Sequence, residues 1–140
     1  VLSSPRARAR RTAELAGLAV SEFTEDLAEW DYGEYEGRTT PEIRESIPDW
    51  TVWTHPCPGG EAAAQVGARA QRVLNRVRDV LDDGDVVLVG HGHFSRVMVA
   101  TWLGLPPTAR PRGGAGTVTG RTATRSGPCW AARQSRARAC

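Results

Sequence analysis

Lysine is absent from this sequence, whose 18 basic residues are all arginines. Cysteine is scarce and widely spaced, at Cys57, Cys129 and Cys140, which argues against a disulfide framework and against a closely spaced zinc motif. Long apolar runs are also missing, since none approaches the ~20 residues that cross a bilayer, and the N-terminal residues lack the order of a signal peptide. We therefore expect a cytoplasmic protein with no membrane partner.

Acidic residues are missing from the last part of the chain. All 16 of them lie at or before Asp85, whereas residues 106–140 contain seven arginines and no acidic residue. This segment also lacks Leu, Ile, Phe, Met and Tyr, so it cannot build a core. A chain of 140 residues has room for one ordinary domain. We predict a folded domain over residues 1–107 and an Arg- and Gly-rich, disordered tail over residues 108–140.

Regular apolar spacing predicts a long helix over residues 61–81. The residues of its apolar face are Val66, Ala70, Val73, Val77 and Val80. The apolar run 86–89 is typical of a strand buried on both faces, and a second helix over 95–103 follows it. Helix, buried strand and helix in this order indicate an α/β domain with a parallel sheet.

The first 60 residues are expected to contain shorter elements. A strand ends at Ser4, and a helix over 5–16 follows, with Ser4 as its N-cap and proline at its first position. A short strand over 20–23 comes next. The region 24–60 is loop-like, with one short helix over 41–46. Long loops in small domains often hold functional residues.

The strand exit at 90–93 is the strongest candidate site, because ligands of α/β proteins bind beyond the carboxyl ends of strands. Its glycines allow a close approach, and His91 can donate a hydrogen bond or move a proton near neutral pH. A dinucleotide fingerprint fits poorly, since Ser95 stands where the third glycine would be. Zinc binding by His91 and His93 with His55 is a minority alternative. Histidines that merely cap a helix are an equal alternative on this motif alone.

An arginine run and an acidic, aromatic stretch are the other candidates. Arginines in such a run are mostly solvated surface groups, as we expect for Arg6, Arg10 and Arg11, but one that points to the sheet edge would hold phosphate. In the stretch 29–37, a carboxyl group among large rings can serve as a general acid. An arginine, a histidine and a carboxyl group at strand ends together indicate phosphoryl chemistry.

Four segments resemble motifs of the histidine phosphatase, or phosphoglycerate mutase-like, superfamily. Residues 3–13 are similar to SSPxxRAxxTA, 27–37 to LxExxxGxxEG, 58–61 to PGGES and 87–92 to VxHG. The sequences of residues 27–65 and 90–96 look most like those of actinobacterial acid phosphatases. The resemblance implies a three-layer α/β fold with a mostly parallel sheet.

In that family one histidine attacks a phosphate monoester, and water hydrolyses the resulting phosphohistidine. The resemblance implies that Arg8 clamps the phosphate, His91 stabilises the transferring phosphoryl group, and Glu29 protonates the leaving oxygen and later activates water. It implies no cofactor and no metal. The family's mutases carry ERHYG where residues 29–33 read EWDYG, and the missing basic pair favours a phosphatase over a phosphoglycerate mutase.

The expected substrate is a small-molecule phosphomonoester. Residues expected to line its pocket are Gly92, His93, Trp30, Tyr32 and Phe94, and burial in the core is an equal alternative for each aromatic. The oligomeric state is open, and a homodimer is compatible with the sequence.

Two features depart from the family pattern. No Arg-His-Gly segment occurs, although in the family this segment follows the first, central strand and supplies the nucleophile. Residues after Leu105 resemble nothing in the family. We therefore expect a fragment whose first strand is missing and whose activity is weak or absent.

Two non-catalytic alternatives remain. The basic tail could bind nucleic acid through its phosphates, but Trp130 is its only stacking residue, so we do not expect a nucleic-acid partner. A pseudophosphatase that binds phosphate through Arg8 and His91 without turnover is the other alternative. An enzyme hydrolyses the phosphate ester, whereas a pseudophosphatase only binds it, so a turnover measurement distinguishes the two.

Overall fold

The computed structural model describes residues 1–81 and 83–109 of the chain. In chain order its strands and main helices are β1 (Leu2–Ser3), α1 (Ala7–Leu15), β2 (Glu22–Phe23), α2 (Thr40–Arg44), α3 (Ala63–Arg78), β3 (Leu88–Val89) and α4 (Gly92–Trp102). Two short 3-10 helices, η1 (Glu25–Leu27) and η2 (Gly33–Tyr35), lie between β2 and α2. In the described ranges no helix is both long and apolar enough to cross a bilayer. The tail predicted over 108–140 lies outside the described residues from 110 onward.

A parallel sheet of three strands forms the centre of the fold, in the order β2-β1-β3. Ser3 of β1 pairs with Phe23 of β2 on one side and with Val89 of β3 on the other. The predicted α/β class with a parallel sheet is confirmed. Because the strands run in the same direction, the segments that follow β1 and β3 meet at the same edge of the sheet.

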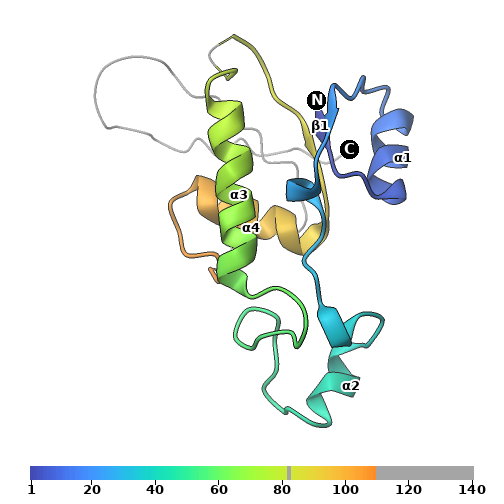
Figure 1. The fold of residues 1–140 in the computed structure, drawn as a ribbon, viewed down its shortest axis with the longest axis vertical. Helices are drawn as coiled ribbons and strands as arrows, with labels where there is room; N and C mark the ends of the chain where they lie inside the picture. The colour runs from blue at the N-terminus through green and yellow to red at the C-terminus, as the bar shows by residue number, and fades with distance from the viewer. Residues whose placement is uncertain (82, 110–140) are drawn as a thin grey trace, which may run out of the picture.

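Helices lie on both sides of this sheet. Figure 1 shows α1 on one side of the strands and α3 with α4 on the other, which gives three layers. The residues of the predicted apolar face of α3 that are buried are Val66, Ala70, Val73 and Val77. Val80 was predicted on the same face but is 49% exposed, because α3 ends at Arg78 and the chain leaves the helical path there.

All four helices begin at other residues than the sequence predicts: α2 and α3 are shifted by one and two residues, and the starts of α1 and α4 differ for reasons that the structure shows. The N-cap of α1 is Arg6 and not Ser4, whose buried hydroxyl is used inside the protein. The helix predicted from Ser95 begins at Gly92, with His91 as N-cap. Its first turn is capped by a carboxylate from a distant part of the chain, a partner that no local sequence rule reveals.

The long region between β2 and α3 extends beyond the end of the strands and includes α2, as Figure 1 shows. At two glycines, the first and last parts of this region approach each other closely through their backbones. A Cβ on Gly33, whose φ is +54°, would lie 2.1 Å from the Pro58 carbonyl oxygen, and a Cβ on Gly60 would lie 2.4 Å from that of Asp31. This close backbone contact holds the segment after Glu29 against the segment that leads into α3.

Candidate active site

Ser4, Arg8 and His91 meet at the carboxyl edge of the sheet. Ser4 follows β1, His91 follows β3, and Arg8 lies in the first turn of α1. The Arg8 Nε–H group donates to His91 Nδ1 at 2.9 Å, and His91 Nε2 lies 2.8 Å from Ser4 Oγ. Because Nδ1 accepts a hydrogen bond, the proton of the neutral imidazole is on Nε2 and is donated to Ser4. The two contacts fix both the orientation and the tautomer of His91.

The electrostatics of this cluster suit an anion. Burial lowers the pKa of His91, the positive charge of Arg8 lowers it further, and the charge of Glu29 opposes both effects. The imidazole is therefore neutral at pH 7. Arg8 forms no ion pair with any described carboxylate, so its charge is not neutralised. It lies near the N-terminus of α4, where the helix dipole also favours negative charge.

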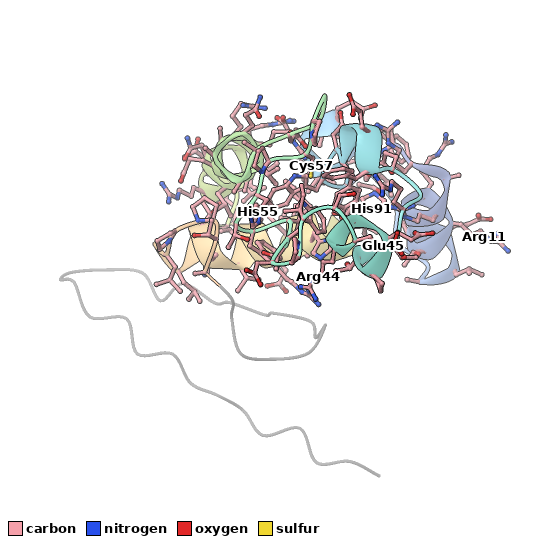
Figure 2. The ribbon with its side chains drawn as sticks, turned by 90° about the horizontal axis from the view of Figure 1, so that it is seen from below. Arg11, Arg44, Glu45, His55, Cys57 and His91 are labelled. Carbon is pink, nitrogen blue, oxygen red and sulfur yellow. The ribbon has the colours of Figure 1, made fainter. Side chains whose placement is uncertain are left out.

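The other arginines of the run lie on the surface, as predicted. Arg6 and Arg11 each form an exposed ion pair, and the Arg10 guanidinium lies over a phenylalanine ring. Figure 2 shows Arg11 projecting outward from α1, whereas His91 lies inside the body. Of these four arginines, Arg8 alone contacts His91.

Glu29 caps α4 from 65 residues earlier in the chain. Its carboxylate accepts the Phe94 N–H at 2.9 Å, the His93 N–H at 3.4 Å and the N–H of its neighbour Trp30 at 3.0 Å. The first two are N–H groups that a helix cannot satisfy within its own first turn. The carboxylate is therefore held beside His91, at the same helix terminus.

A cavity of about 660 Å³ lies between the region 32–53 and the first two turns of α4, and none of Ser4, Arg8, Glu29 and His91 lines it. Tyr32 and His93 line it, together with Trp53 and Arg96. The Tyr32 hydroxyl lies 2.5 Å from His93 Nδ1, and the Trp53 ring meets the His93 ring edge-on at 5.4 Å. Burial raises the pKa of Tyr32 and lowers that of His93, so both groups are neutral at pH 7.

Known proteins were compared with the chain. The family model of the histidine phosphatase superfamily (branch 1) matches residues 1–132. The chain belongs to the histidine phosphatase superfamily. It is similar to an acid phosphatase of Mycobacterium tuberculosis, with 56% identity over 106 residues that make up 76% of this chain and 52% of that protein.

Further comparisons agree with this family. A sedoheptulose 1,7-bisphosphatase of Saccharomyces cerevisiae is 33% identical over 129 residues, 75% of this chain and 48% of that protein. A solved structure of an open reading frame product of Mycobacterium tuberculosis matches with a TM-score of 0.74 and 54% identity, over 76% of this chain and 55% of that one. This histidine phosphatase chain thus spans about half the length of the curated relatives it matches.

The structure separates the five residues expected to bind substrate in this histidine phosphatase chain. Tyr32 and His93 line the cavity, and Gly92 lies exposed at the start of α4. Trp30 and Phe94 are each only 1% exposed. Trp30 donates its indole N–H to the Glu61 carbonyl oxygen at 2.8 Å. For these two aromatics the structure favours the packing alternative.

Metal binding by the histidines finds no support in the described ranges. Both ring nitrogens of His91 already have protein partners, Arg8 and Ser4. No group of three or more His, Cys, Asp or Glu side chains is placed to hold an ion among residues 1–81 and 83–109.

Sequence reasoning missed two parts of the site. Ser4 was assigned to a helix cap, although its place directly after a strand parallel to the one before His91 could have indicated the contact. Arg69, which forms an ion pair with Glu61 under the Glu29 loop, was not singled out, and Glu61 was noted only as part of the 58–61 motif. Glu61 precedes α3, and the two residues are 8 positions apart. The local rule for ion pairs on a helix, a spacing of three or four residues, therefore does not point to them.

Proposed function

We propose that this chain forms the part of a phosphomonoester hydrolase site that holds the phosphate and protonates the leaving group. The contact between Arg8 and His91 supports this most strongly, because it places an arginine that pairs with no carboxylate of residues 1–81 and 83–109 beside a neutral histidine at a helix N-terminus. A guanidinium matches two phosphate oxygens at once. The similarity to an acid phosphatase supports phosphomonoester hydrolysis as the reaction type.

The proposed roles are those that the family resemblance implies, and the geometry is compatible with them. Arg8 binds two phosphoryl oxygens, and His91 donates its Nε2–H to the phosphoryl group once this hydrogen leaves Ser4. Glu29, held at the same helix terminus, protonates the oxygen that departs when the ester P–O bond breaks. In the family, the phosphoryl group is transferred to a histidine nitrogen, and water then cleaves the P–N bond. Catalysis of this kind depends on positioning and charge stabilisation.

The substrate class is a small-molecule phosphomonoester whose leaving group lies in the cavity beside His93. The cavity walls include aromatic rings and arginines, among them Tyr32, Trp53 and Arg96, which suit an organic leaving group with polar substituents. The family's nucleophile belongs to an Arg-His-Gly segment that the sequence does not contain. We therefore propose that the chain by itself binds phosphate and turns over weakly or not at all.

Hydrolysis of p-nitrophenyl phosphate between pH 4 and 8 tests this proposal. Three proteins are compared: the chain, its His91→Ala variant, and a version preceded by an Arg-His-Gly strand taken from the related acid phosphatase. We expect strong activity only in the extended version and its loss when His91 is also replaced. Equal activity of the chain and the His91→Ala variant would show that other residues catalyse the reaction.

A further inference from the structure

We propose that Arg69 is a positioning residue that holds Glu29 in place. What Glu29 does in hydrolysis rests on the proposed function, but its placement does not. All five N–H donors of the Arg69 guanidinium are used. Two bind the Glu61 carboxylate at 2.7 and 2.6 Å, and three bind the carbonyl oxygens of Asp26, Ala28 and Glu29 at 3.1, 3.0 and 3.3 Å.

Glu61 continues this support on the other side of Glu29. Its carboxylate accepts the Asp31 N–H at 3.1 Å, its own N–H donates to the Asp31 carbonyl oxygen at 2.9 Å, and its carbonyl oxygen accepts the Trp30 indole at 2.8 Å. The pair Arg69–Glu61 therefore fixes the backbone before and after Glu29. Its side chains are only 12% and 19% exposed, so solvent screens the pair little.

Arg69 also contacts the residue that binds the Glu29 carboxylate. Its guanidinium carbon lies 4.9 Å from the centroid of the Phe94 ring, and the Phe94 N–H donates to Glu29. One side chain thus holds both the backbone of Glu29 and its main hydrogen-bond partner. A lysine would keep the charge but has three donors that cannot reproduce the planar fork.

The test compares the full chain with Arg69→Lys and with a matched control, Arg72→Gln. Arg72 lies on the same helix and binds the same loop, at the Asp26 carboxylate, but it is 56% exposed. Amide exchange and the pH titration of the Phe94 N–H chemical shift report the Glu29 contact. In Arg69→Lys we expect the Phe94 N–H to exchange about 10²-fold faster, because its local hydrogen bond to Glu29 is lost. We also expect the chemical shift of this N–H to stop following a carboxyl titration.

Arg72→Gln should leave both readouts unchanged. If Arg69→Lys does not fold, Glu61→Gln replaces it, and there we expect the same loss of the Phe94 titration. Wild-type exchange and titration of Phe94 in a folded Arg69→Lys or Glu61→Gln protein would overturn the positioning role.

A kinetic comparison links the positioning to chemistry, in the extended version described above. Alkyl phosphates need a protonated leaving oxygen, whereas 2,4-dinitrophenyl phosphate does not. Arg69→Lys should lower kcat on the alkyl ester by about 10²-fold and that on the activated ester by less than about threefold. A parallel loss on both esters would show a merely structural role. Should the extended version hydrolyse neither ester, the proposed function fails, and the Phe94 measurement still decides the positioning role.

Discussion

Arg8 Nε donates to His91 Nδ1 across 83 residues of sequence, at 2.9 Å. The contact exists because β1 and β3 are parallel neighbours, so that the segments after them emerge at the same edge of the sheet. The remaining Arg8 donors form no hydrogen bond or ion pair with a carboxylate of the described residues. A positive charge that no described carboxylate neutralises lies beside a neutral imidazole, and we expect a bound phosphate to use this feature.

The pH dependence of stability should report His91. Its pKa is lowered in the folded state, first by burial and then by Arg8, while the unfolded chain keeps the ordinary value of about 6.5. The unfolded state therefore binds the proton more readily, and stability, fully present above about pH 6.5, falls as the pH drops through 6.5 toward the folded pKa. His93, whose pKa is also lowered by burial, acts in the same direction.

Urea unfolding at pH 7.5 and pH 5.0 measures this effect. We expect the free energy of unfolding to fall between the two pH values in the wild type and to fall less in His91→Asn. His55→Asn, a change at a histidine bonded to Thr54 outside the site, should retain the wild-type difference. A His91→Asn protein with an unchanged pH dependence would refute the assignment.

The Ser4 hydroxyl should hold the tautomer of His91. Ser4 is fully buried, and its Oγ lies 2.8 Å from His91 Nε2. In Ser4→Ala we expect a loss of about 1 kcal/mol in the free energy of unfolding and a weaker affinity for phosphate. Ser21→Ala, which removes two exposed hydrogen bonds to Val1, should change neither. A Ser4→Ala variant with wild-type phosphate affinity would show that Ser4 acts in packing alone.

The Tyr32 hydroxyl should stabilise the wall of the cavity through His93. In Tyr32→Phe the Nδ1 atom of His93 loses its partner at 2.5 Å, which should cost about 1 kcal/mol in the free energy of unfolding. Tyr35→Phe is the matched control, because within the described part of the chain the Tyr35 hydroxyl has no hydrogen-bond partner. Chemical denaturation of both variants measures the difference, and equal effects would argue against the bond.

Gly60 should be intolerant of any side chain. A Cβ there would lie 2.4 Å from the Asp31 carbonyl oxygen, so Gly60→Ala must displace the loop that carries Glu29. We expect a loss of about 1 to 3 kcal/mol in the free energy of unfolding. At Gly84, a Cβ would meet nothing within 4 Å, and Gly84→Ala should be close to neutral. Similar stabilities of the two variants in a thermal or urea melt would contradict this.

Motif spacing predicted the parts of the fold and site that depend on local sequence. The apolar face of α3 and the strand before His91 are visible as periodicity and as an apolar run. Arg8, His91 and Glu29 were selected because their motifs agree with a known family. The structure brings all three to one edge of the sheet.

Long-range contacts could not be predicted in the same way. Ser4 fits a local capping rule, yet its hydroxyl binds a histidine 87 residues later. The first turn of α4 is capped by the Glu29 carboxylate, and no residue close to Gly92 in the sequence indicates this partner. Arg69 donates to backbone carbonyl oxygens, and these are present at every residue, so no side-chain pattern marks its targets.

Calorimetric titration of the full chain with inorganic phosphate at pH 7 measures whether Arg8 holds a phosphate group. Arg8→Gln is compared with Arg11→Gln, an arginine of the same helix that pairs with Glu14 on the surface. We expect the wild type and Arg11→Gln to bind phosphate alike and Arg8→Gln to lose affinity by about tenfold or more. Equal affinities of all three proteins, or no binding by the wild type, would contradict this role of Arg8.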